Sequence, residues 1–506
     1  MSGPEACAPR YDAGTTLPAW NPIMPDHTTV ASPPDTASGP DLRALLDRQR
    51  AAFATDINPS LATRLDRLDR LERLVERDGD AFATAIGRDF GTRSPIVTGL
   101  TETLVLRAGL RHARRHLKAW MKPRRVRTGL IYRPGRCLLL SQPLGVIGII
   151  GAWNYPLLLS LSPLIDVLAA GNRAIVKPSE LTPAFAAALQ AGVAATFAPE
   201  EVAVVTGDAE IGRAMASLPF DHLVFTGSTN VGRQVAQAAA VNLTPVTLEL
   251  GGKSPAIIDE SADLRAAAGS VAWGKLMNAG QTCVAPDYAL VPRARRDDFV
   301  AELRQAIARQ YPTMQANPDY TSIASERHYR RLQSLVEDAR AKGARVIDLA
   351  PSGEATDPAT RQLAPSLLLD VDDGMRIMQE EIFGPLLPIV TYGTLVDAIA
   401  YVAARERPLS LYWFGGDRRH RDQVLARTIA GGVVINDTML HVAQDSLPFG
   451  GVGASGHGHY HGEFGFRRFS KEKPVFIQSR FSGGRRMYPP YTAATRQLLR
   501  LLFRWA

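Results

Sequence analysis

The chain has 506 residues, of which 45% are hydrophobic and 21% are charged, and it carries three cysteines and a formal net charge of +8 at pH 7. This balance excludes a disordered or fibrous chain, and the length predicts about three domains or lobes. Three cysteines cannot form a disulfide framework, and their low number favours a reducing compartment, so we expect a cytoplasmic protein.

The first segment, residues 1–40, is rich in Pro, Ser, Thr and Ala and has no basic cluster followed by an apolar core. We therefore expect a mobile tail and no signal peptide. Amphipathic helices are predicted next, over residues 41–54, where Asp41 is a suitable N-cap, and over residues 61–86. A third helical region ends near Trp120.

Much of the positive charge lies in residues 107–127, at the end of this helical region. A nucleic-acid-binding patch would interleave aromatic residues, and Trp120 is the only Phe, Tyr or Trp in the block. We interpret the block as a solvated helix face and expect no nucleic acid partner. Residues 123–142, which follow, are a candidate contributor to an oligomerisation element.

Residues 137–165 contain no charged side chain and could be misread as a membrane span. A span needs about 20 apolar residues in an unbroken helix, whereas Pro143, Pro156 and Pro163 interrupt this stretch. We predict instead a buried parallel strand over residues 146–150, followed by a turn and a buried helix that ends at Gly171, and no transmembrane span.

From Gly145 to residue 249 apolar strands alternate with helices, a pattern that predicts βαβ units and a parallel sheet. A second α/β segment is predicted over residues 250–430. The remainder, residues 431–506, is a Gly-rich return segment with a terminal amphipathic helix that carries arginines on one side. That helix is expected to dock on the chain itself or on a second subunit, with peripheral membrane contact as the alternative.

Ligands of parallel α/β sheets bind beyond the carboxyl ends of the strands, which directs attention to three turns. In "FTGSTNVG" a strand delivers Gly227, Ser228 can cap the next helix, and Gly232 lets that helix approach the sheet. The helix N-terminus suits a pyrophosphate, although an ordinary strand–helix turn explains the pattern equally well. In "IVKPSE", Lys177 and Glu180 can hold a ribose, and the carboxylate favours NAD over NADP; the alternative is a surface turn.

Two further residues carry possible chemistry. Glu249 lies within an apolar strand, where burial raises the pKa of a carboxyl towards the range of a general base; the alternative is a Glu paired with a nearby Lys. Cys283, in "GQTCVAPDY", lies in a segment that is typical of neither helix nor strand. A thiolate is a strong nucleophile, but a lone cysteine is more often a small buried apolar residue, and no histidine is close to it in the sequence.

The motifs taken together are far more specific than any one of them alone. "WNYP", "KPSE", "FTGSTNVG", "LELGGKSP", "GQTC" and "EEIFGPLLP" occur in this order, and from about Asp41 onwards the chain resembles the aldehyde dehydrogenase superfamily. Finer features such as "QDSLPFGGVGASGHGHYHG" and "YPPY" resemble its class 3 branch, and within it the coniferyl aldehyde dehydrogenases. The resemblance implies an α/β fold with a Rossmann-like parallel-sheet coenzyme domain over residues 41–249, a second α/β catalytic domain, and a small oligomerisation extension in a homodimer.

The resemblance also implies a role for each motif. Cys283 would attack the aldehyde to give a thiohemiacetal, and Asn154 would donate to the oxyanion. After hydride transfer to NAD, or alternatively NADP, Glu249 would activate the water that hydrolyses the thioester. The cofactor would be held by residues from four motifs: Lys177, Glu180, Gly227, Ser228, Gly232, Glu381 and Phe383.

Some features stay open at this level. The substrate is expected to be an aromatic, coniferyl-aldehyde-like or otherwise apolar aldehyde, with Tyr155, Tyr288 and Phe449 as candidate pocket walls. We assign no metal, because three histidines in the Gly-rich loop "GHGHYHG" supply only part of a ligand set. Acyl transfer to coenzyme A and a catalytically silent homologue are the competing hypotheses, and retention of Asn154, Glu249 and Cys283 argues against both.

Overall fold

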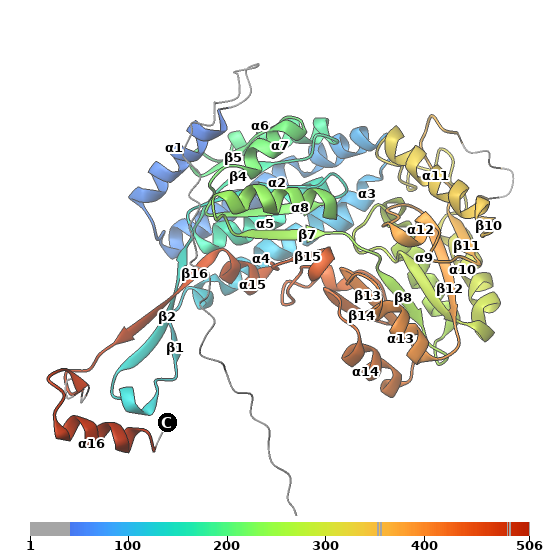
Figure 1. The fold of residues 1–506 in the computed structure, drawn as a ribbon. Coiled ribbons are helices and arrows are strands. Elements are labelled where there is room, and N and C mark those ends of the chain that lie inside the picture. The colour runs from blue at the N-terminus through green and yellow to red at the C-terminus, as the bar shows by residue number, and fades with distance from the viewer. Residues whose placement is uncertain (1–40, 352–353, 355–356, 483, 485–486, 505–506) are drawn as a thin grey trace, which may run out of the picture. The chain divides into compact units, whose positions relative to one another are not determined.

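Three β-sheets organise the chain in the computed structural model, which describes residues 41–351, 354, 357–482, 484 and 487–504 (Figure 1). The tail expected over residues 1–40 lies outside the described residues. From residue 40 onwards the chain forms one compact unit.

The described part begins with helices, as the periodicity predicts. Asp41 caps the first of them by accepting from the Ala44 backbone N–H at 2.8 Å. A π-helical turn, η1, interrupts the last helix of the group. These elements are α1 (Leu42–Thr55), α2 (Leu61–Phe90), α3 (Pro95–Thr98), η1 (Gly99–Thr103) and α4 (Leu104–Trp120).

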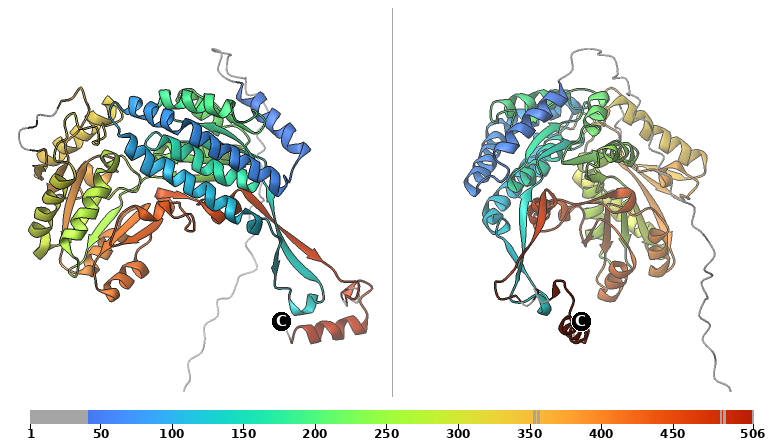
Figure 2. Two further views of the ribbon diagram at one scale, coloured as in Figure 1. Left: turned by 180° about the vertical axis from the view of Figure 1, so that it is seen from behind. Right: turned by 60° about the vertical axis from the view of Figure 1, so that its left-hand side comes forward.

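The first large sheet has the strand order β15-β7-β6-β3-β4-β5 and is parallel except at β15. Its strands are β3 (Val146–Ile150), β4 (Arg173–Lys177), β5 (Val202–Val204), β6 (His222–Gly227), β7 (Val246–Leu250) and β15 (Gly456–His457). The connecting helices are α5 (Pro156–Ala170), α6 (Pro183–Ala194), α7 (Ala209–Ala216) and α8 (Thr229–Val241). Residues from α2, α5 and α6 form the core on one face, and residues from α1, α7 and α8 the core on the other (Figures 1 and 2).

The charge-free stretch is therefore strand β3 followed by helix α5, which ends where Gly171 adopts a left-handed φ of 92°. All five residues of β3 are buried, which is the reason for their unbroken apolar character. Among the described residues, no helix combines the length and the apolar character needed to cross a bilayer.

The second large sheet has the order β10-β11-β12-β9-β8-β13-β14 and is parallel except at β10. Its strands are β8 (Pro255–Ile258), β9 (Tyr288–Pro292), β10 (Arg345–Asp348), β11 (Ser366–Leu369), β12 (Leu386–Tyr392), β13 (Ser410–Phe414) and β14 (Gly432–Ile435). Its helices are α9 (Leu264–Leu276), α10 (Arg296–Gln310), α11 (Glu326–Ala341), α12 (Arg376–Gln379), α13 (Leu395–Ala403) and α14 (Arg418–Arg427). Strand β14 extends this sheet past residue 430, because it pairs with β13 in parallel.

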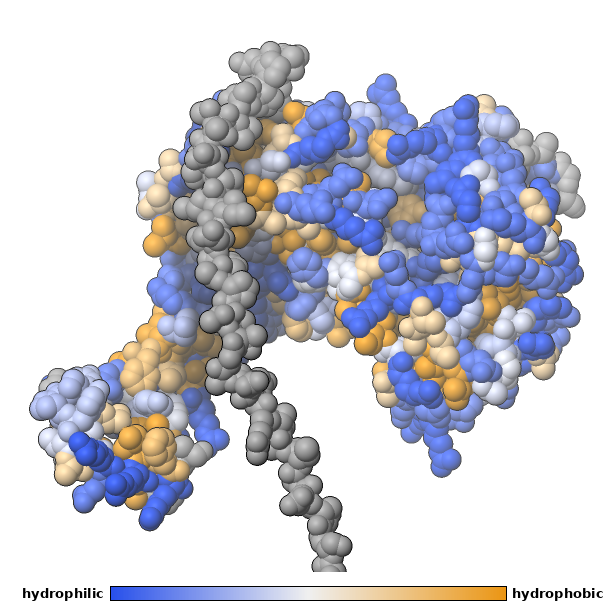
Figure 3. Space-filling view, in the orientation of Figure 1, coloured by the Kyte–Doolittle hydropathy of each residue, from blue (hydrophilic) through white to orange (hydrophobic). Residues whose placement is uncertain are grey.

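The third sheet is small and antiparallel, with the order β1-β2-β16. Its strands are β1 (Arg124–Val126), β2 (Arg136–Pro143) and β16 (Ser470–Ile477), and the helices before and after β16 are α15 (Gly462–Arg468) and α16 (Ala493–Leu502). The sheet thus joins residues 123–142 to the end of the chain. Apolar side chains are exposed on and around it (Figure 3), among them Leu130, Tyr132, Phe476, Ile477 and Phe481.

Candidate functional site

Cys283 lies in a buried loop between α9 and β9, which explains why its segment predicts neither helix nor strand. Asn278, Ala279 and Gly280 adopt left-handed φ values of 54°, 52° and 74°, a conformation that is unfavourable for the two non-glycine residues. Gln281 fixes the loop, since its Nε2 donates to the Asn278 carbonyl and to the Ser322 carbonyl, each at 3.0 Å. The thiol is therefore presented by a rigid, strained turn.

Glu249 lies near the end of β7, where it is 1% exposed. Burial raises the pKa of its carboxyl to about 7, and the adjacent Cys283 thiol opposes that rise. Among the described residues, neither oxygen of the Glu249 carboxylate accepts a well-formed hydrogen bond. The neighbouring Cys283 thiol is therefore its one interaction partner there, through a loose contact. The alternative of a Glu–Lys pair is therefore wrong.

The same contact acts on the cysteine. Burial and the neighbouring carboxylate of Glu249 raise the pKa of the Cys283 thiol well above its ordinary value. In the protein alone Cys283 is consequently a neutral thiol at pH 7, and Glu249 is the group placed to accept its proton.

Asn154 follows β3 in the turn that leads into α5, and its side chain reaches the cysteine loop. Its Nδ2 donates to the Gln281 carbonyl at 3.2 Å, and the next residue, Tyr155, shares a hydrogen bond of 2.6 Å with the Thr282 hydroxyl. Cys283, Glu249 and Asn154, from segments far apart in the sequence, are thus brought together.

The turns that follow β4 and β6 lie at one edge of the first sheet, because these strands are parallel neighbours of β3. Lys177, at the end of β4, is buried, and its Nζ lies 3.2 Å from a Glu180 carboxylate that is 43% exposed. Ser228 caps α8 by accepting from a backbone N–H in the first helical turn. A Cβ atom at Gly227 would lie 2.6 Å from the Phe225 ring.

Gly232, one turn into α8, packs against Leu250 so closely that a Cβ atom there would lie 2.6 Å from a Leu250 methyl group. Helix α8 therefore approaches β7 as the sequence suggests, and its N-terminus lies at the carboxyl edge of the sheet. Such an edge, with a free helix start and a half-exposed carboxylate, is the ordinary place for a dinucleotide.

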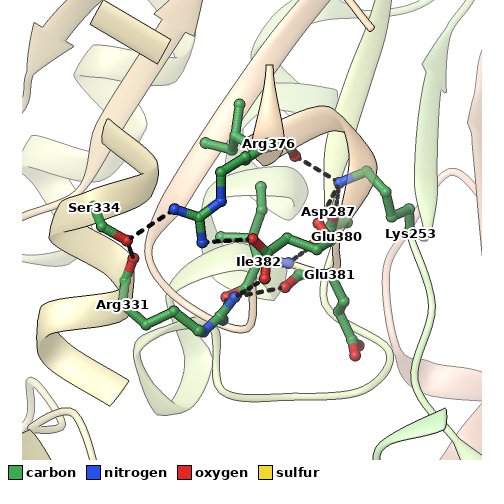
Figure 4. A network of polar contacts seen from close by, with 9 residues as sticks. Lys253, Asp287, Arg331, Ser334, Arg376, Glu380, Glu381 and Ile382 are labelled. Atoms are coloured by element: carbon green, nitrogen blue, oxygen red, sulfur yellow. Dashed lines mark hydrogen bonds and ion pairs between the residues drawn. The ribbon is translucent and has the colours of Figure 1, made fainter. Parts of the chain in front are cut away.

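Glu381 and Phe383 belong to a segment that a polar network holds in place (Figure 4). Lys253 Nζ forms an ion pair with Asp287 and donates to the Ile377 and Glu380 carbonyls at 2.8 and 3.1 Å. Asp287 in turn accepts from the Ile382 backbone N–H at 2.9 Å. The network fixes the backbone on both sides of Glu381, and the Glu381 carboxylate itself accepts from the Gly252 backbone N–H.

The Glu381 carboxylate lies against Gly251, where a Cβ atom would be 2.0 Å from it, so only glycine fits there. Burial, followed by the negative charge of Asp287, raises the pKa of Glu381 to about 8. Phe383 has a left-handed φ of 54°, and its ring lies 5.4 Å from that of Trp153, beside Asn154. All the residues proposed from the sequence to touch a cofactor are therefore at this edge or beside the cysteine loop.

Several residues at the site were not identified from the sequence. Tyr460 is close enough to Glu249 and Cys283 for their charges to raise the pKa of its hydroxyl. The buried Lys275 Nζ has no hydrogen-bond partner among the described residues. Burial lowers the pKa of Lys275 to about 8. Tyr460 lies in the Gly-rich loop before α15 and Lys275 near the end of α9, and neither position carries a local sequence pattern that marks it.

Of the three residues predicted to line the substrate pocket, the structure places two near the thiol and one elsewhere. Tyr155 contacts the cysteine loop, and the ring of Phe449 lies 6.0 Å from that of Tyr460. Tyr288 was a wrong choice, because it lies in β9 within the hydrophobic core of the second sheet and contacts Tyr401. Strand β9 is buried on both faces, so the sequence pattern around Tyr288 does not show which face of the strand adjoins a ligand.

Comparison with known proteins gives a consistent result. Residues 11–475 match the model described as "Aldehyde dehydrogenase family". A "Probable coniferyl aldehyde dehydrogenase" of Pseudomonas aeruginosa is 49% identical over 462 residues, which cover 91% of this chain and 96% of that protein.

Solved structures agree with the sequence matches. The substrate-bound state of Staphylococcus aureus AldH superposes with a TM-score of 0.86 at 39% identity, covering 91% of this chain and 99% of that one. An indole-3-acetaldehyde dehydrogenase in complex with NAD⁺ gives a TM-score of 0.78 at 26% identity, covering 86% and 88%.

Proposed function

Because the chain belongs to the aldehyde dehydrogenase family, we propose that it oxidises aromatic aldehydes of the coniferyl aldehyde type to carboxylic acids with NAD, through a thioester on Cys283. The observation that carries the proposal is the meeting of a nucleophilic thiol, a carboxylate without a firm partner and an amide donor: Cys283, Glu249 and Asn154. That the enzyme is an aldehyde dehydrogenase follows from the family itself; substrate class and residue roles are the proposal.

The residues at the edge of the first sheet fit NAD. The glycine at position 227 leaves room where a side chain would collide with the Phe225 ring, and the α8 N-terminus suits the pyrophosphate. Glu180, oriented by the buried Lys177, is placed for the adenosine ribose hydroxyls, and its charge disfavours the 2′-phosphate of NADP. Glu381 and Phe383 would hold the nicotinamide ribose. When bound, NAD supplies the acceptor for the hydride that leaves the substrate.

The first steps form the acyl-enzyme. Glu249 accepts the thiol proton, the Cys283 sulfur bonds to the carbonyl carbon, and the carbonyl π electrons move to oxygen. The Asn154 amide and the Cys283 backbone N–H donate to this oxyanion; such a donor contributes about 3–4 kcal/mol to the transition state. When the carbon loses its hydride the C=O bond reforms, which leaves a thioester on the sulfur.

The last steps release the acid. Glu249 first releases the thiol proton to solvent. It then takes a proton from a water molecule whose oxygen attacks the thioester carbon, and the tetrahedral adduct collapses with breakage of the carbon–sulfur bond. The acid leaves, and the Cys283 thiolate takes the proton back from Glu249, which restores both groups. A carboxyl whose pKa is about 7 is well matched to this work at neutral pH.

The aromatic specificity rests on the relative from P. aeruginosa and on the aromatic residues around the thiol. Tyr155, Phe449, Tyr460 and Trp153 lie on or next to the elements that carry Asn154 and Cys283. Initial rates of NADH formation with coniferyl aldehyde, benzaldehyde and a long-chain alkanal test it. We expect the highest kcat/KM for coniferyl aldehyde; a long-chain alkanal that is preferred would contradict the substrate class.

We further propose that residues 41–249 bind the coenzyme, that residues 250–430 together with β14 carry the catalytic thiol, and that the β1-β2-β16 sheet forms a homodimer in the cytoplasm. The free cysteines Cys137 and Cys283 suit a reducing compartment. Exposed apolar residues of the small sheet, and the outer edge of β16, which has no neighbouring strand in the described part of the chain, suit a second copy of the chain. Sedimentation at micromolar concentration tests the dimer, and co-sedimentation with anionic vesicles tests the alternative, membrane contact through α16.

A further inference from the structure

The turn η1 places one acidic residue inside the protein. A regular α-helix rotates residues four positions apart by about 40° relative to one another. The wider turn absorbs part of this rotation, so that Thr98, Glu102, Leu106 and Leu110 all remain on the buried face. Turns of this kind are rare and recur at functional sites. Here the turn directs the Glu102 side chain towards the start of α5.

Both oxygens of Glu102 are used. Oε2 accepts from the Leu157 and Leu158 backbone N–H groups at 2.9 and 3.0 Å, which satisfies the first turn of α5. Oε1 accepts from Arg93 Nη2 at 2.5 Å, and neither side chain of this ion pair is exposed to solvent. A carboxylate from one helix thus holds the start of another.

The second guanidinium nitrogen of Arg93 reaches the active-site turn. Arg93 Nη1 donates to the Asn154 carbonyl at 2.6 Å, and Asn278 Nδ2 donates to the same oxygen at 3.0 Å. The guanidinium also lies 5.1 Å from the centre of the Tyr155 ring. Arg93 and Asn278 therefore bind the Asn154 carbonyl, and Glu102 binds the backbone N–H groups of the helix start that follows Asn154.

We propose that the buried Arg93–Glu102 pair positions the Asn154 amide for the carbonyl oxygen of the aldehyde. The inference rests on the proposed role of Asn154 as oxyanion donor, and makes Arg93 and Glu102 positioning residues that never touch the substrate. One N–H of the Asn154 amide donates to the Gln281 carbonyl at 3.2 Å, and the second N–H of the same nitrogen is the donor available to the substrate oxygen. With the backbone fixed on both sides, rotation about the side-chain bonds is the only motion left to the amide.

A buried ion pair is a costly way to join two helices, because both charges lose their hydration. Part of that cost is offset where its polar atoms form hydrogen bonds: both Glu102 oxygens and the two terminal nitrogens of Arg93 do so, whereas Arg93 Nε has no partner among the described residues. A lysine at position 93 would keep the charge but provide one nitrogen, which cannot reach Glu102 and the Asn154 carbonyl with the same fork geometry. This difference supplies a test.

The test uses Arg93→Lys and Glu102→Gln in the full chain, with Glu76→Gln as the matched control. Glu76 of α2 pairs with Arg107 of α4, close in the chain to the buried pair but at the surface. We expect the burst rate of NADH formation to fall about 10- to 100-fold in both buried variants, because small misplacements of a reacting group cost rates of that order. The dissociation constant for NAD should stay within twofold of wild type, and the control should match wild type throughout.

Combination with Asn154→Ala separates positioning from general support of the fold. If Arg93 acts through Asn154, adding Arg93→Lys to Asn154→Ala lowers the burst rate no further, whereas independent effects multiply. Multiplied losses, or burst rates equal to wild type in a folded Arg93→Lys variant, overturn the inference. An unchanged burst rate in Asn154→Ala instead overturns the oxyanion role on which it rests. Should Arg93→Lys fail to fold, Glu102→Gln and its double variant with Asn154→Ala carry the same comparison.

Discussion

The carboxylate of Glu249 and the thiol of Cys283 face each other inside the protein; the carboxylate raises the energy of the thiolate, whereas the neutral thiol stabilises the carboxylate. Burial raises the pKa of Glu249 to about 7, and burial together with Glu249 raises that of Cys283 further above its ordinary range. One negative charge is thus shared between two groups that both need to lose a proton during turnover. Five predictions concern this pair and the residues that surround it.

Substitution of the two residues should separate the two halves of the reaction. Cys283→Ala removes the atom that bonds to the substrate, so oxidation should be abolished. Glu249→Gln keeps the size of the side chain but cannot accept a proton from water, so steady-state turnover should fall about 100-fold or more. The first turnover should still release NADH, although more slowly, because the variant also removes the charge that raises the pKa of the Cys283 thiol, which can then lose its proton to solvent. Stopped-flow absorbance of NADH measures both phases. Steady-state turnover equal to wild type in Glu249→Gln would reject Glu249 as the base.

The pH dependence of deacylation should follow Glu249. Only the ionised carboxylate can accept a proton, so the rate of thioester hydrolysis should rise with pH and level off above about 7, with half of the change near that value. Single-turnover hydrolysis between pH 5.5 and 8.5 measures the profile. A flat profile over this range would contradict the assignment, as would an inflection that persists unchanged in Glu249→Gln.

The same carboxyl should make stability depend on pH. Its pKa in the folded protein is raised above the ordinary value of 4.5, so its contribution to stability is fully present below pH 4.5 and is lost as pH rises through about 7. Glu249→Gln removes this loss and should stabilise the protein at pH 8 relative to wild type, by up to about 3 kcal/mol, with little effect at pH 5. Denaturant unfolding at the two pH values measures the difference, and an equal effect at both would refute the argument.

Cofactor choice should depend on Glu180. Its half-exposed carboxylate is next to the buried Lys177 ammonium, where it would repel a 2′-phosphate. Glu180→Gln should therefore raise kcat/KM for NADP relative to NAD, by about 10-fold if the repulsion is worth about 1.4 kcal/mol. Initial rates with each cofactor at saturating aldehyde give the ratio. Glu210→Gln, in the exposed Glu210–Arg213 pair of α7, is the matched control and should leave the ratio unchanged.

The Lys253–Asp287 pair should be required for the segment that carries Glu381 (Figure 4). Lys253→Met leaves Asp287 buried without its cation, a change that typically costs about 3–5 kcal/mol, and frees the Ile377 and Glu380 carbonyls. We expect a lower Tm and weaker NAD binding, measured by thermal unfolding and by titration. The matched surface variant, Arg296→Met at the exposed pair with Asp297, should change neither.

The sequence by itself predicted most of the local structure. Alternation of apolar strands with helices located the elements of the first sheet, and Asp41 and Gly171 marked a helix start and a helix end where the structure has them. The order of the motifs also indicated the family, which the comparisons show. These features are readable because periodicity, capping and turn conformation depend on neighbours within a few positions in the chain.

Only the tertiary structure decided which distant residues meet. Asn154 reaches the carbonyl of Gln281 across 127 positions, Arg93 joins Glu102 to the active-site turn, and Tyr288 faces a core instead of a pocket. Each of these contacts depends on strand order and on the phase of a π turn, neither of which leaves a local pattern. A buried strand is apolar on both faces whichever of them adjoins the site, so the direction of a side chain is settled by packing alone.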